Sequence, residues 1–84
     1  MTGVLETYLR RALISEGLEV HALEIERYSP EFFGNLIANA DTNCGKLRIV
    51  YDRSFFVELS PNWTGPSAGV MVAAMGREKR RPPT

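Results

Sequence analysis

Two short stretches within residues 47–59 alternate strictly between apolar and polar side chains, and no other feature of the sequence restricts the fold as tightly. Their apolar rows are Leu47, Ile49, Tyr51 and Phe55, Val57, Leu59. Such alternation is typical of strands with one buried face. A connection of three residues, 52–54, sets Tyr51 opposite Phe55, whereas a two-residue turn would set Tyr51 opposite Phe56 and mix apolar with polar rows. The sequence therefore predicts an antiparallel hairpin in one register.

That register has two local consequences. On the reverse face it sets Arg48 opposite Glu58, so we expect a cross-strand ion pair there. A three-residue hairpin loop usually has its left-handed residue in the last position, so we expect a positive φ and a modest strain at Ser54.

A further strand is predicted from Phe33 to about Ala40, followed by a four-residue connection over 41–44. This length pairs Ala38 with Leu47 and Leu36 with Ile49, which keeps small and apolar residues on the core face. The middle of the chain then reads as a three-stranded meander.

The first part of the chain has helical periodicity, with apolar residues at Leu5, Tyr8, Leu9, Ala12 and Leu13. We expect an amphipathic helix over residues 3–16, with Thr2 as N-cap and Gly17 as a left-handed stop. For residues 19–28 two interpretations stay open. One is a strand with a bulge near Ala22, and the other is a continued helix. Residues 29–31 are predicted to form a turn around Pro30.

After a turn-rich loop over residues 61–66, the apolar segment 68–75 is expected to form a short helix that something must cover. The predicted fold is α+β, with the N-terminal helix packed on a three- to four-stranded antiparallel sheet and a short C-terminal helical segment. We expect a single domain over residues 1–76 and a disordered basic tail over residues 77–84.

Composition excludes several classes of function. A lone Cys44 forms no internal disulfide, and neither zinc spacing nor a phosphate-binding loop is present in the sequence. His21, the single imidazole, has no nucleophile or acid arranged around it. We expect no enzyme activity, no cofactor and no metal. The sequence shows neither a signal peptide nor an apolar run long enough to span a membrane, so a cytoplasmic location is predicted.

Charge divides the chain unevenly. The tail holds four basic residues and one acidic residue, which leaves six basic and nine acidic residues, a net charge of −3, for residues 1–76. An acidic body argues against a phosphate-binding domain. The alternative is a small nucleic-acid accessory protein that uses the basic residues of its tail, namely Arg77, Lys79, Arg80 and Arg81.

The reverse face of the predicted sheet is the main candidate for binding another protein. Strand parity gathers Ile37, Val50 and Phe56 at its centre, with Arg48 and Glu58 in a polar rim. Two further sets of residues are candidates: Asp52 and Arg53 at the hairpin tip, which turn chemistry alone explains equally well, and Trp63, which is either a plug over the core or an exposed anchor. Either segment 68–75 covers this face or a partner does, and the chain is expected to be a monomer or a homodimer.

Residues 33–35 (Phe-Gly-Asn) and 47–59 resemble a hairpin of small immunity-type proteins that accompany bacterial secreted or contact-delivered toxins. The chain differs from that pattern at Ser54, where the resemblance has glycine. The resemblance implies stoichiometric neutralisation of a protein toxin without a cofactor. A phage-type inhibitor of a bacterial defence complex belongs to the same mechanistic class, and both remain open from the sequence.

Overall fold

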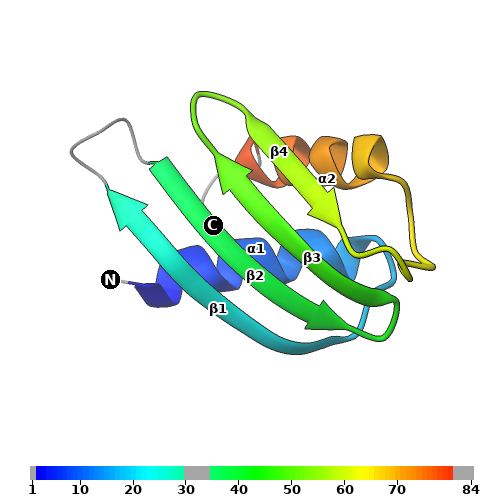
Figure 1. The fold of residues 1–84 in the computed structure, drawn as a ribbon. Helices are drawn as coiled ribbons and strands as arrows, with labels where there is room; N and C mark the ends of the chain where they lie inside the picture. Colours follow the sequence, from blue (N-terminus) through cyan, green and yellow to red (C-terminus); the bar gives the residue numbers. More distant parts are fainter. Residues whose placement is uncertain (1, 30–34, 81–84) are drawn as a thin grey trace.

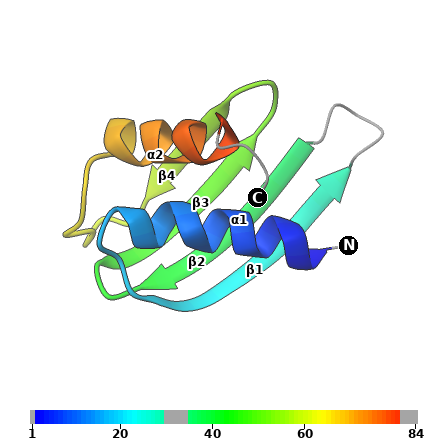
Figure 2. The same ribbon diagram turned by 180° about the vertical axis from the view of Figure 1, so that it is seen from behind.

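The expected helices and strands are all present in the computed structural model, which describes residues 2–29 and 35–80. In chain order they are α1 (Thr2–Ser15), β1 (Val20–Ser29), β2 (Asn35–Thr42), β3 (Gly45–Tyr51), β4 (Phe55–Leu59) and α2 (Ala68–Arg80). The strands form one antiparallel sheet in the order β1-β2-β3-β4. Both helices lie on the same side of this sheet, as Figures 1 and 2 show from opposite directions. The predicted α+β class is confirmed.

The β3–β4 hairpin has the predicted register, with Tyr51 opposite Phe55 and Arg48 opposite Glu58. The position of the strained residue was predicted wrongly. Asp52 N–H donates to the Ser54 carbonyl (3.1 Å), so the ladder continues one pair beyond the strands and leaves Arg53 alone at the tip. The positive φ therefore falls on Arg53 (68°) and not on Ser54.

The β2–β3 register differs from the prediction by two residues. Ala38 lies opposite Ile49, and Thr42 lies opposite Gly45, so the turn between them is shorter than expected. The hydroxyl of Thr42 explains the tighter turn, because it accepts from Cys44 N–H (3.0 Å) and donates to the Gly45 carbonyl (2.8 Å). A shift of two residues leaves every side chain on its predicted face.

Residues 20–29 form a strand, so the continued helix is wrong and the bulged strand is confirmed. The register of β1 against β2 shifts between Val20 and Ala22, as expected, and shifts again between Ile25 and Arg27. The extra residues are therefore His21 and Glu26. Positions 30 and 31 of the expected turn, like Phe33 at the expected start of β2, lie outside the described residues.

The core lies between the helices and the sheet. Gly17, in the left-handed conformation (φ 82°), ends α1, and the N–H groups of Gly17 and Leu18 donate back to the carbonyls of Ile14 and Leu13. Leu18 is thereby turned into the core. The buried apolar cluster consists of Leu9, Ala12, Leu13, Leu18, Leu36, Ala38, Ala40, Leu47, Ile49, Met71 and Met75.

The start of the disordered tail was predicted wrongly, too early in the sequence. Helix α2 continues to Arg80, so residues 77–80 are helical, while residues 81–84 lie outside the described part. Contacts with α1 hold this end of α2 in place: Tyr8 Oη donates to the Met75 carbonyl (2.8 Å), and Arg77 pairs with Glu16 (2.6 Å). A helix that is already formed and held on α1 up to Arg77 extends at little cost, because each added residue forms one more backbone hydrogen bond.

Replacing Arg53 with glycine is expected to stabilise the fold by about 0.5–1 kcal/mol, because glycine adopts a positive φ without the steric cost that arginine incurs. Chemical denaturation of the wild type and the variant measures the difference. Ser54→Gly is the matched control and should give no gain. A gain at Ser54 and none at Arg53 would contradict the observed turn.

Replacing Arg77 with alanine is expected to lower the free energy of unfolding by roughly 0.5–1 kcal/mol, since the pair with Glu16 is short but partly exposed. The control is Arg10→Ala, which breaks the longer pair between Arg10 and Glu6 (3.9 Å) within α1 and should change stability less. Equal effects at the two arginines would show that the Arg77 pair does not help to hold α2 on α1.

Candidate functional site

The face of the sheet that points away from the helices is open in the described part of the chain (Figure 1). Segment 68–75, one of its two expected covers, packs on the helical side, where Met71 and Met75 are fully buried. Phe56, which belongs to the open face, is 56% exposed. Of the two predicted covers, segment 68–75 is therefore excluded, and a partner on this face stays a prediction.

Three apolar side chains form a row across the open face. Ile37 on β2 pairs with Val50 on β3, and Val50 pairs with Phe56 on β4. Facing positions on neighbouring strands put their side chains in contact range, so we name Ile37, Val50 and Phe56 the apolar row. The strands hold these residues in place, and only part of their surface is covered.

A polar row runs next to the apolar row, two residues away along β2, β3 and β4. It consists of Asn39, Arg48 and Glu58, and the bulge residue Glu26 of β1 reaches it with its carboxylate. Glu26 accepts a hydrogen bond from Asn39 Nδ2 (2.9 Å) and pairs with Arg48 (3.5 Å). Arg48 Nε lies 3.9 Å from Glu58 Oε1, which confirms the expected cross-strand ion pair. Arg48 is thus the central cation between two carboxylates, in pairs that are long and half-exposed.

Glu26 is not among the residues predicted for partner binding, although a signal for its position exists. The apolar side chains of β1 change phase a second time after Ile25. Leu23 and Ile25 stand at odd-numbered positions, whereas the next large apolar residue, Tyr28, stands at an even-numbered one. Such a change indicates a bulge. The bulge residue is the one whose carboxylate reaches Asn39 and Arg48.

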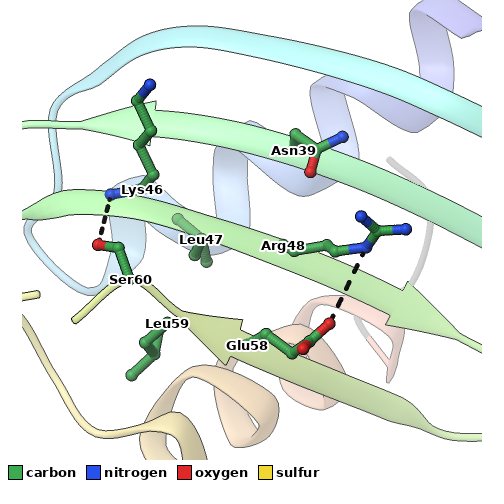
Figure 3. Close-up of a pocket in the computed structure, with 7 residues that line it drawn as sticks. All are labelled: Asn39, Lys46, Leu47, Arg48, Glu58, Leu59 and Ser60. Atoms are coloured by element: carbon green, nitrogen blue, oxygen red, sulfur yellow. Dashed lines mark hydrogen bonds and ion pairs between the residues drawn. The ribbon is translucent and has the colours of Figure 1, made fainter.

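A shallow hollow of about 340 Å³ lies beside the polar row, at the end of the sheet away from the β3–β4 tip (Figure 3). It is lined by Asn39, Lys46, Leu47, Arg48, Glu58, Leu59 and Ser60. Figure 3 shows Arg48 directed toward Glu58 across the hollow, with Lys46 at its other end. Ser60 closes the hollow by accepting from the backbone N–H of Lys46 (3.2 Å). The hollow is therefore open, with charged side chains around a lining that is mostly apolar.

The hairpin tip adjoins the other side of the apolar row. Asp52 follows β3 in register with Ser54, so strand alternation places its side chain on the open face, two residues beyond Val50. Asp52 and Arg53 are both exposed. The structure thus brings together seven of the predicted partner-binding residues: Ile37, Arg48, Val50, Asp52, Arg53, Phe56 and Glu58.

Trp63 does not belong to this group. It lies at the opposite end of the sheet and on the helical side, packed against the buried core. Its Nε1 donates to the Pro66 carbonyl (2.7 Å), and its ring fills the space beside Gly45 and Gly65. A Cβ at Gly65 would lie 2.8 Å from the indole, so this loop is built around the ring. Of the two predicted roles, the plug agrees with this position.

Three of the four basic residues of the alternative site lie in the described part of the chain. Arg77 is paired with Glu16, Lys79 and Arg80 belong to α2, and Arg81 lies outside the described residues. The nucleic-acid alternative stays a prediction. Among the described residues no group of three or more His, Cys, Asp or Glu side chains is placed to hold a metal ion. No helix in the described part is long and apolar enough to cross a membrane.

Comparison of the chain with protein-family models, with curated proteins and with solved structures found no match.

Replacing Trp63 with alanine is expected to lower the free energy of unfolding by about 2 kcal/mol or more, since it removes a large ring packed against the core and leaves a cavity beside two glycines. Thermal or urea unfolding measures this loss. If Trp63 were instead a binding anchor, the same variant would keep its stability.

Proposed function

We propose that this chain is a non-enzymatic, protein-binding inhibitor that uses the open face of its sheet. One observation carries the proposal: Phe56, 56% exposed, ends an apolar row that the strands hold rigid and that charged residues surround. An apolar centre with a polar rim is the usual composition of a protein interface. Large aromatic side chains in such centres supply a disproportionate share of binding energy.

The polar residues of the face support binding more than chemistry. Arg48 is held between Glu26 and Glu58, and Asn39 is held by Glu26. Groups that orient one another on a flat, exposed surface set the register of a docked protein and discriminate between partners. They lie along a sheet, whereas catalytic groups converge on one atom of a substrate in a cleft.

Within this proposal the chain acts stoichiometrically, in the cytoplasm and without a cofactor, by covering the functional surface of another protein. The hairpin resemblance favours a bacterial toxin as that protein, and a subunit of a defence complex targeted by a phage-type inhibitor fits the same mechanism. In both cases inhibition is steric, because a rigid sheet occupies the surface that the partner needs.

The test is a matched comparison of capture by tagged wild type and by Phe56→Ala. We expect this variant to lose less than about 1 kcal/mol of folding stability, because the ring is mostly exposed, and to bind its partner at least ~2 kcal/mol more weakly. Arg48→Ala should also weaken capture. Ile14→Ala is the control, since Ile14 is equally exposed (58%) but lies on α1, on the other side of the molecule.

Capture is measured by mass spectrometry of proteins that co-purify from the native cell, and then by titration of the identified partner. A partner that binds Phe56→Ala and wild type equally well would refute the use of the open face. A fall in stability of ~3 kcal/mol with unchanged capture by the remaining folded protein would show that Phe56 is a structural residue.

A further inference from the structure

The open face carries a charge pattern that is complementary to itself. On β3 and the residue after it, three side chains on this face follow one another at a spacing of two: Arg48, Val50 and Asp52. The order is therefore cation, apolar residue, anion. On the neighbouring strand, the two residues of this face that flank Phe56 are the anion Glu58 and the small polar residue Ser54.

We propose that the open face pairs with the open face of a second copy of this chain, about a two-fold axis that runs along the apolar row. Rotation about this axis returns each residue of the apolar row to its own counterpart and exchanges the two sides of the row. Arg48 of one copy then faces Asp52 of the other, and Glu58 of one copy faces Ser54 of the other, whose hydroxyl can donate to its carboxylate. Symmetry makes each of these contacts twice.

The hollow supports the same arrangement. It lies on the polar side of the apolar row, bounded by Arg48, Glu58 and Lys46. The rotation that sets Asp52 against Arg48 also places the hairpin tip of the second copy over this hollow.

The pairing also agrees with the way sheets pack. A rotation about an axis across the strands leaves the strands of the two sheets nearly aligned, which is one of the two common arrangements for sheets packed face to face. The helices α1 and α2 remain on the outer surfaces, because both lie on the far side of the sheet (Figure 2).

This inference rests on the proposed function in one respect, since both assign the open face to protein binding. It adds that the face is occupied by a second copy until a target displaces it. Target binding and self-association are then mutually exclusive, and the dimer conceals Phe56 in the free protein.

The experiment is sedimentation velocity of the full-length protein over a range of concentrations. We expect a dimer at about 100 µM, where even a Kd of about 10 µM leaves most of the chain associated. Arg48→Glu and Asp52→Arg should each weaken the dimer by about tenfold or more, because each opposes like charges. The double variant Arg48→Glu/Asp52→Arg restores the opposite-charge contacts and should recover most of the association. Ile14→Ala should dimerise as the wild type does.

Val50→Asp, which sets two carboxylates against each other on the axis, is a second, independent variant if Arg48→Glu does not fold, and it should leave the protein monomeric. A wild-type monomer at ~100 µM would overturn the inference, and so would a double variant no better than its parents or a Val50→Asp variant that dimerises as the wild type does. Each of these results leaves the proposed function intact if Phe56→Ala still loses its partner. Conversely, suppose that the double variant recovers the dimer while an identified partner binds Phe56→Ala as well as it binds the wild type. That pair of results would support the second copy and refute the proposed function.

Discussion

The division of the sheet into two faces determines almost everything else in this molecule. Alternation along β3 and β4 sends Leu47, Ile49 and Val57 to one side and Arg48, Val50 and Phe56 to the other, and the helices bury only the first set. Because the side-chain period of a strand is two, a residue of these two regular strands cannot change face without a bulge or a slip of the register. The core and the open face are therefore fixed by the same constraint.

The sequence predicted the structure correctly where the alternation of side chains decides it. It did not do so where the geometry depends on single hydrogen bonds. Parity predicted the β3–β4 register residue by residue, and it kept the faces of β2 right even though the register was two residues out. The tight turn depends on where the Thr42 hydroxyl donates and accepts, which alternation does not encode. The strain moved from Ser54 to Arg53 for a similar reason, because one extra ladder bond shortened the loop.

The candidate site was predicted as far as it lies on regular strands. Ile37, Arg48, Val50, Phe56 and Glu58 all occupy the expected face, whereas Trp63 stands in a loop whose path no periodicity describes. Segment 68–75 is apolar almost all round, so its sequence favoured neither side of the sheet. Its position follows from contacts between distant parts of the chain, such as Tyr8 with Met75 and Arg77 with Glu16.

An exposed apolar row on a rigid sheet is a hazard as well as a binding surface, because it invites unspecific association. The edges of this sheet are restricted: β1 is bent by bulges at His21 and Glu26, and β4 is short and is followed by Pro61 after one further residue. The face has no comparable steric protection in the described residues. Charge limits the choice of partners, because any protein that covers Phe56 must also place complementary groups against Arg48, Glu58 and the tip residues. A second copy supplies such a group with its own Asp52, and a target must bind the face more tightly than this copy does in order to displace it.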